Sequence, residues 1–164
     1  MEVALGEITL KISTEVLLKI SEYIQDDNVK PESGGMLIGY YLENGDFSIT
    51  DVTVPGKGDR QSRYRFVRSA KRAFNLLTFH FNNSKGKKIY LGEWHTHPED
   101  IPTPSSIDNS SILDRIRRDK INSDTIFMII CGIKKIYIQR VKKSGLKEFV
   151  YVSLEGVAIL TTAR

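Results

Sequence analysis

Two histidines separated by a single residue are the most chemically informative feature of the sequence. His95 and His97 directly follow an apolar stretch over residues 88–94 that is typical of a strand. In an extended strand, residues two apart point to the same face, so both imidazoles would lie on one side of the chain. Pro98 cannot donate a hydrogen bond to a neighbouring strand. We therefore predict that the strand ends there and leaves the two histidines at its exposed end.

A carboxylate follows at a spacing that suits a third ligand. The pattern is HxHx7SxxD, in which Asp108 comes after a loop that contains three prolines. The prolines restrict this loop and lower the ordering cost of holding Asp108 near the histidines. Two imidazoles and one carboxylate suit tetrahedral zinc and leave the fourth position open for water, as in catalytic zinc sites. We therefore predict one zinc ion held by His95, His97 and Asp108.

Glu32 and Ser105 could complete a hydrolytic site. Zinc lowers the pKa of water to about 7 and so supplies a nucleophile at neutral pH. Amide hydrolysis also needs a group that takes a proton from water and gives it to the leaving amine. We predict Glu32 in this role, because the small residues that follow it, Ser33 to Gly35, permit close approach of backbone and substrate. Ser105 could donate a hydrogen bond to the oxyanion on the attacked carbonyl.

Each of these signals also has a purely structural interpretation. Taken alone, SxxD before an apolar-periodic segment favours a helix capping box, with Ser105 as the cap. The two histidines could be one core residue and one surface residue, and Glu32 alone is typical of a solvated loop.

Five other candidates are interpreted as structural. His80 lies on a predicted helix without a paired ligand. Glu93 could orient an imidazole, but a solvated or salt-bridged role is favoured. Glu99 and Asp100 could compete as ligands, although their loop position favours a role in shaping the rim of the site. Cys131 lies in an apolar strand and is predicted to be an inert, buried thiol.

The elements that must position these residues alternate between strands and helices. We predict strands over 7–12, 36–41, 47–54, 88–94, 125–131, 134–141 and 147–153, and helices after Ser13, over 69–82 and over 106–120. Residues 55–68 show little periodicity and are predicted to form a mobile surface loop. This alternation predicts one α/β domain over residues 1–164 with a mixed, substantially buried sheet. Hairpin-length connections among the late strands make part of that sheet antiparallel.

Composition narrows the class of protein. A chain of 164 residues with 40% hydrophobic and 27% charged residues fits one ordered globular domain. We find no export signal and no apolar stretch near the roughly 20 residues that cross a membrane as a helix. A single cysteine excludes an internal disulfide, and we expect a cytoplasmic protein. The net charge of +4 comes in short basic clusters without a binding motif, so we expect no nucleic-acid partner.

An upstream glutamate followed by HxHx7SxxD resembles the JAMM metalloproteases, also called the JAB or MPN family. The resemblance covers essentially the whole chain in element order. It implies zinc held by His95, His97 and Asp108, with Glu32 as general acid and base and Ser105 as oxyanion support. It also implies a single JAMM/MPN-like α/β domain, whose curved, mixed and mostly antiparallel sheet is flanked by helices. Together with the joint occurrence of these residues, this resemblance outweighs the structural interpretations.

The segment from Gly92 to Pro98 is similar to the compact prokaryotic branch of that family. This branch includes proteins of bacterial antiphage (CBASS) operons, which act beside a ligase resembling ubiquitin-activating and ubiquitin-conjugating enzymes. The resemblance implies an isopeptidase that removes a CD-NTase, a cGAS-like nucleotidyltransferase joined through its C-terminus, from target proteins. Residues 55–68 would then grip the extended C-terminal tail of that substrate.

Two other functions stay open. The same chemistry could process a small sulfur-carrier protein to expose its terminal Gly-Gly, and gene neighbours would separate this activity from deconjugation. Alternatively, the chain could be a non-catalytic MPN-like scaffold. The complete set of site residues weighs against a scaffold, because a scaffold has no physical need for an open metal site.

Overall fold

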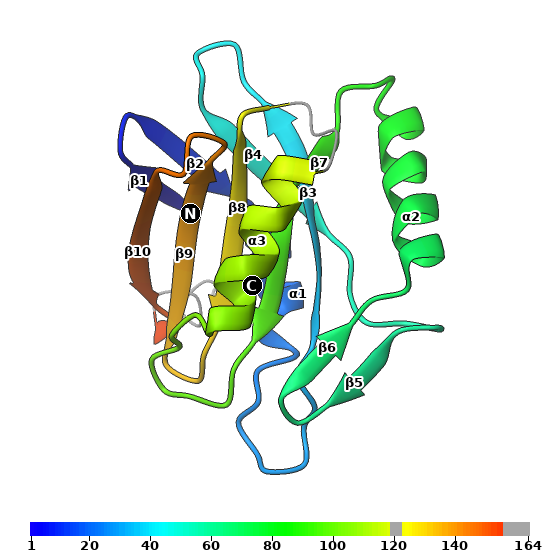
Figure 1. The fold of residues 1–164 in the computed structure, drawn as a ribbon, viewed down its shortest axis with the longest axis vertical. Coiled ribbons are helices and arrows are strands. Elements are labelled where there is room, and N and C mark those ends of the chain that lie inside the picture. The colour runs from blue at the N-terminus through cyan, green and yellow to red at the C-terminus, as the bar shows by residue number, and fades with distance from the viewer. Residues whose placement is uncertain (119–122, 156–164) are drawn as a thin grey trace.

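The dominant element of the structure is one curved, eight-stranded sheet (Figure 1). This computed structural model describes residues 1–118 and 123–155. In spatial order the strands are β1 (Glu2–Leu5), β2 (Ile8–Ile12), β4 (Phe47–Val52), β3 (Gly34–Tyr41), β7 (Ile89–Thr96), β8 (Thr125–Cys131), β9 (Lys135–Lys142) and β10 (Lys147–Ser153). Neighbouring strands run antiparallel except for two parallel pairs, β2 with β4 and β7 with β8. The predicted mixed and mostly antiparallel sheet is therefore confirmed.

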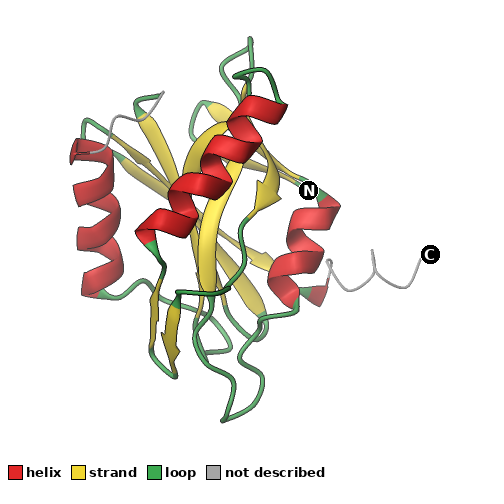
Figure 2. Cartoon of the chain, turned by 90° about the vertical axis from the view of Figure 1, so that its right-hand side faces the viewer, coloured by secondary structure: helices red, strands yellow, loops and turns green. Residues whose placement is uncertain are grey.

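Three helices flank this sheet, and two of them cover opposite faces (Figures 1 and 2). The helices are α1 (Thr14–Ser21), α2 (Ala70–Asn83) and α3 (Ser106–Arg118). The apolar side of α1 packs into the larger core cluster, whereas Ile112 and Ile116 of α3 pack into a second cluster on the other face. In contrast, α2 lies at the side of the molecule and contributes no fully buried residue. Among the described residues, no helix is long and apolar enough to span a membrane.

Strand β8 is the centre of this two-sided packing. All seven of its residues are buried. Phe127 and Ile129 join the core cluster beneath α1, and the alternate residues Met128 and Ile130 join the cluster beneath α3. The sequence of a strand that is covered on both faces is a continuous run of apolar residues, without the alternation of apolar and polar residues seen in half-exposed strands. This explains why the sequence predicted a buried strand here.

The two ends of the sheet are joined by a buried arginine. Arg140 on β9 is only 4% exposed and donates to the Leu5 carbonyl of β1 at 3.2 Å. Its guanidinium also pairs with Glu148 on β10 and with Glu7 in the β1–β2 turn, each at 3.0 Å. These contacts hold the outer strands together, so the sheet is curved and partly closed.

Most predicted elements are confirmed, with shifts at their ends. Helix α1 begins after Ser13, as predicted, but ends at Ser21 instead of continuing toward Ile24. Helix α2 begins after Ser69, whose hydroxyl accepts a hydrogen bond from the Arg72 N–H at 3.3 Å. Strand β1 was not predicted, because its four residues form a pattern too short to detect. The predicted end of the third helix, at residue 120, lies outside the described residues.

The prediction of a mobile surface loop over residues 55–68 is wrong for residues 60–67. Residues 60–67 form a small antiparallel hairpin of β5 (Arg60–Ser62) and β6 (Arg65–Val67). Its strands are short and largely polar, and its turn contains no glycine or asparagine, so neither periodicity nor turn composition marks it. The hairpin is held instead by contacts with the distant segment around Glu32, which no local pattern encodes.

We predict that loss of the α1 cap destabilises the whole domain. The Ser13 hydroxyl accepts a hydrogen bond from the Val16 N–H at 3.3 Å. Ser13→Ala should lower the free energy of unfolding by about 1 kcal/mol, which corresponds to a fall in Tm of about 2–4 °C for a chain of this size. Ser13→Asp should retain the cap. The control is Ser21→Ala at the other end of the helix, and an equal loss there would contradict the capping role.

Candidate metal centre

Strand pairing places His95 in the middle of the sheet. In β7 it lies opposite Gly34 of the antiparallel strand β3 and opposite Ile130 of the parallel strand β8. The Thr96 N–H donates to the Ser33 carbonyl at 2.9 Å, which extends the β3 pairing by one residue. The residue before Ser33 is Glu32, so this register brings the predicted proton shuttle to the same end of the sheet as His95.

His97 lies just beyond the end of β7, as predicted from Pro98. Its backbone N–H donates to the Cys131 carbonyl, the last residue of β8, at 3.0 Å. The chain therefore remains extended through His97, and residues 95 and 97 share one face. Their rings lie with centroids 4.9 Å apart, and the two Nε2 atoms are separated by 3.2 Å.

The first turn of α3 supplies the third side chain. The Ser105 hydroxyl accepts from the Asp108 N–H at 3.1 Å, and the Asp108 carboxylate accepts from the Ser105 N–H at 2.7 Å. This reciprocal pair is a capping box. The structural interpretation of SxxD is thus confirmed, yet the same carboxylate also faces both histidines. A carboxylate has lone pairs enough for both tasks.

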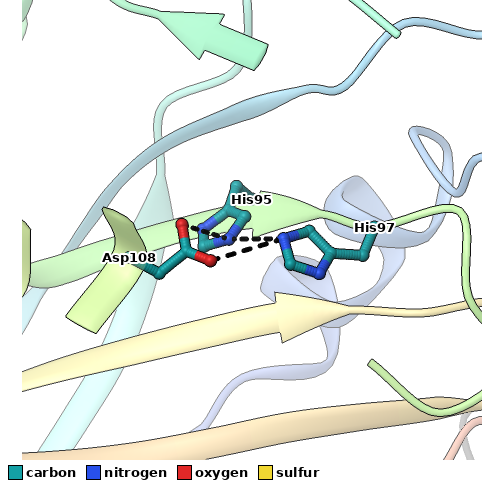
Figure 3. Close-up of side chains that lie close together, drawn as sticks. All are labelled: His95, His97 and Asp108. Atoms are coloured by element: carbon teal, nitrogen blue, oxygen red, sulfur yellow. Dashed lines mark hydrogen bonds and ion pairs between the residues drawn. The ribbon is translucent and has the colours of Figure 1, made fainter. Parts of the chain in front are cut away.

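The three side chains converge on a common point (Figure 3). Asp108 Oδ1 lies 3.3 Å from His95 Nε2, and Asp108 Oδ2 lies 3.6 Å from His97 Nε2. Tetrahedral zinc with bonds of about 2.0–2.1 Å requires ligand atoms roughly 3.3–3.4 Å apart. The two Nε2 atoms lie 3.2 Å apart, and each imidazole faces a different oxygen of the Asp108 carboxylate, at 3.3 and 3.6 Å, so one ligand atom from each residue lies within 4.8 Å of the others. Among the described residues this is the one group of histidine, cysteine and acidic side chains with the geometry of a metal site.

The local electrostatics favour the protonation states that ligands need. Burial and the neighbouring His95 lower the pKa of His97, so its imidazole is neutral over a wider range of pH. Burial alone would raise the pKa of Asp108, but hydrogen bonds from His95 and Ser105 hold it well below its usual range. A metal binds a neutral imidazole and an ionised carboxylate. Neither His97 nor Asp108 therefore has to lose a proton near neutral pH in order to bind a metal.

Glu32 lies half-buried beside this cluster. Burial raises the pKa of its carboxyl, as does the charge of Asp108, while the charge of His95 and a hydrogen bond from the Phe66 backbone oppose the rise. The adjacent Gly34 leaves room for this arrangement, because a Cβ there would come within 2.7 Å of both the Phe66 ring and the Trp94 carbonyl. Gly34 therefore permits close approach of the backbone to Phe66 and Trp94, and the predicted approach of a substrate at these small residues stays a prediction.

A cavity of about 600 Å³ opens in front of these residues. Glu32, Ser105 and the three converging side chains all line it. One wall is β6, through Arg65, Phe66 and Val67, and the opposite wall is α3. The sequence missed the β6 wall because the hairpin itself carries no recognisable pattern.

Glu93 forms the ionic centre of the cavity floor. Its carboxylate accepts from Arg68, from Tyr90 at 2.7 Å and from Arg115 at 3.1 Å. These partners come from the segment before α2, from β7 and from α3. The favoured salt-bridged interpretation of Glu93 is confirmed, since its described contacts are with these three partners and not with either histidine.

The other candidates are not part of the converging group of side chains. His80 on α2 faces Asp51 at 3.6 Å, and Asp100 binds Lys134 at 2.5 Å. Glu99 lies on the rim, 3.8 Å from His97 Nδ1, which is too long for a hydrogen bond. Cys131 is buried, and burial raises the pKa of its thiol to about 12. The prediction of a buried thiol is therefore confirmed, and its raised pKa agrees with an inert one.

Comparisons with known proteins point in the same direction. Residues 13–142 match a family model described as prokaryotic homologs of the JAB domain. A protein of Escherichia coli named CD-NTase/cGAS isopeptidase is 35% identical, over 84% of this chain and 85% of its own. Proteins with the same name from Vibrio cholerae and Pseudomonas aeruginosa are 32% and 34% identical, over 84% and 83% of this chain and 85% of each relative.

We predict that Asp108 contributes directly to metal affinity. Asp108→Asn should weaken zinc binding by more than about 100-fold, because loss of a direct ligand exceeds the 10–100-fold effect of losing an outer-shell partner. Isothermal titration calorimetry of the metal-free protein with zinc measures this change. Asp114→Asn is the matched control, because Asp114 lies on the same helix and pairs with Arg118 at 3.8 Å. Equal zinc affinity in both variants would contradict the assignment.

Proposed function

The chain belongs to the JAB-domain family of prokaryotes, and from that membership we propose that it is a zinc-dependent isopeptidase. The observation that carries the proposal is the convergence of His95, His97 and Asp108, whose ligand atoms lie within 4.8 Å of one another, inside a cavity lined by Glu32. The geometry fits a hydrolytic site more closely than a scaffold, because these polar side chains surround an open cavity and are not packed into the core.

The names of the relatives support the substrate class that we propose. All three are called CD-NTase/cGAS isopeptidase. We therefore propose that this chain hydrolyses the amide bond between the C-terminal residue of a CD-NTase and the protein to which it is attached. In this proposal the conjugate is made by a ligase encoded nearby, which resembles ubiquitin-activating and ubiquitin-conjugating enzymes, and deconjugation belongs to cytoplasmic antiphage defence.

His95, His97 and Asp108 would hold the zinc ion. Bound zinc would polarise the scissile carbonyl and supply a water nucleophile at neutral pH. The protein keeps these three side chains on a rigid strand end and a capped helix, so little reorganisation is needed at the moment of reaction.

Glu32 is the proposed proton shuttle. Its carboxylate takes a proton from the attacking water and then gives it to the leaving amine nitrogen as the amide bond breaks. Its raised pKa suits both steps, because a carboxyl with a pKa closer to neutrality is a stronger base and is more often protonated when an acid is needed.

Ser105 is the proposed oxyanion donor. Its hydroxyl oxygen already accepts from the Asp108 N–H, and within the described part of the chain the hydroxyl donates to no other group. Its hydrogen is therefore available to the carbonyl oxygen of a substrate as negative charge develops there. The capping contact already fixes the position of the Ser105 oxygen, so this side chain need not lose further conformational freedom when the substrate binds.

The hairpin wall suits an extended polypeptide tail. In the described structure, strand β6 pairs only with β5. The other edge of β5 is bonded to the Glu32 segment, because the Glu32 N–H donates to the Ser62 carbonyl at 2.8 Å. The cavity side of β6 is therefore the edge available to a substrate strand. An extended tail could lie between β6 and α3 with its last residue at the metal site.

We predict that Glu32→Gln separates metal binding from catalysis. The variant should keep about one zinc per chain, because the three proposed ligands are unchanged. Its cleavage rate should fall by about 100-fold to 10 000-fold. The assay is release of a reporter protein fused to the C-terminal residue of the CD-NTase from the same operon.

Asp26→Asn is the matched control for this variant. Asp26 lies on the same connecting segment and pairs with Lys30 at 2.6 Å, away from the cavity. It should leave cleavage unchanged. Zinc-loaded wild-type protein that cuts neither this fusion nor the natural conjugate would refute the proposed substrate. A sulfur-carrier fusion cleaved in their place would support the processing activity.

Activity should also be lost on mild acidification. The ionised form of Glu32 is the active base, and burial raises its pKa above the ordinary value of 4.5. The rate per zinc-loaded molecule should therefore hold above this raised pKa and fall as the pH drops through it. Bound zinc must be measured at each pH, so that release of the metal is not mistaken for protonation of Glu32. An acidic limb at or below 4.5 would contradict the proposed role.

A further inference from the structure

A buried glutamine connects three parts of the site without lining its cavity. Gln25 lies in the segment between α1 and β3 and is only 1% exposed. Its side-chain Nε2 donates to the Lys30 carbonyl at 3.2 Å and to the Arg63 carbonyl at 2.9 Å. Its Oε1 accepts from the Thr96 hydroxyl at 3.0 Å. One amide therefore contacts its own segment, the hairpin turn and the strand that carries the histidines.

Each contact reaches a functional element within one or two residues. Lys30 lies two residues before Glu32, Arg63 is in the turn between β5 and β6, and Thr96 lies between His95 and His97. The Thr96 hydroxyl also accepts a hydrogen bond at 3.0 Å from the N–H of Ser33, the residue that follows Glu32.

A second layer of hydrogen bonds connects the same parts. Arg63 donates back to the carbonyls of Asp27 and Lys30 at 2.6 and 2.9 Å. Gln61 on β5 donates to the Glu32 carbonyl at 3.0 Å and to the Ser33 hydroxyl at 2.9 Å. The hairpin is thus held mainly by polar contacts, and Gln25 and Thr96 are the most buried residues of this network, at 1% and 0% exposed.

We propose that Gln25 is a positioning residue, which fixes both Glu32 and the β5–β6 hairpin relative to the metal-binding strand. This inference rests on the proposed function, in which Glu32 moves the proton and the hairpin forms the wall of the tail-binding cavity. Gln25 touches neither the ligands nor the cavity, so its effect is on geometry. In a buried network, removal of one member leaves its partners unsatisfied and lets the elements shift.

The test is Gln25→Leu, which removes the amide but keeps a similar volume. On the CD-NTase fusion we expect kcat to fall at least tenfold, because Glu32 is misplaced, and KM to rise several-fold, because the hairpin moves. Zinc content should stay at that of the wild type. Amide hydrogen exchange should become faster in β5 and β6, and this measurement needs no substrate.

Gln139→Leu is the matched control. Gln139 is the other buried glutamine of the described chain, 4% exposed on β9, where its amide donates to the Tyr137 hydroxyl at 2.9 Å and lies outside the cavity. It reports the stability cost of losing a buried amide. If Gln25→Leu changes kcat, KM and hairpin exchange no more than Gln139→Leu does, the proposal is overturned. Loss of zinc from Gln25→Leu would also overturn it, since the ligands are not its target.

Thr96 provides a second test if Gln25→Leu does not fold. Thr96→Val removes the hydroxyl and should reproduce the loss of kcat and the faster hairpin exchange, whereas Thr96→Ser should restore both. Equal behaviour of the two variants would contradict the network. If wild-type protein cleaves no fusion at all, the proposed function fails, but hydrogen exchange still decides whether Gln25 positions the hairpin.

Discussion

The candidate site depends on the pairing of β7 with β3 on one side and with β8 on the other. The antiparallel register sets His95 opposite Gly34, and so brings Glu32 to the end of the same strand pair. The parallel register with β8 extends the strand through His97, whose N–H reaches the Cys131 carbonyl. Because β8 is packed on both faces, a shift in this register would move apolar side chains out of two cores at once.

The third side chain, Asp108, is placed at the site by the capping box at the start of α3. Asp108 closes a capping box with Ser105 and faces both histidines with the same carboxylate. The cap fixes the first turn of α3, and the buried Ile112 and Ile116 fix the helix against the sheet. The stability of this helix and the geometry of the candidate metal centre are therefore coupled. The structural and functional interpretations of SxxD describe one arrangement.

Buried polar contacts do the remaining positioning. Beneath the cavity, Glu93 binds Arg68, Tyr90 and Arg115 and so connects β7 to α3 and to the segment before α2. On the other side, Gln25 connects the Glu32 segment to the hairpin and to β7. Such networks give well-defined positions only when nearly every member is satisfied. The β6 wall of the cavity is thus placed mainly by directional polar contacts, whereas the α3 wall combines them with the apolar packing of Ile112 and Ile116.

The sequence by itself determined the strands and helices with strong periodicity, the start of the first helix after Ser13, and the grouping of His95, His97 and Asp108 as candidate ligands. These features are local, since spacing along a strand or a helix turn fixes which side chains share a face. Tertiary structure alone decided the β5–β6 hairpin, the approach of Glu32 to His95, and which residues Gln25 and Glu93 contact. Those features arise from contacts between residues far apart in the chain, whose short polar segments carry no periodic signal. Only the folded sheet brings them together.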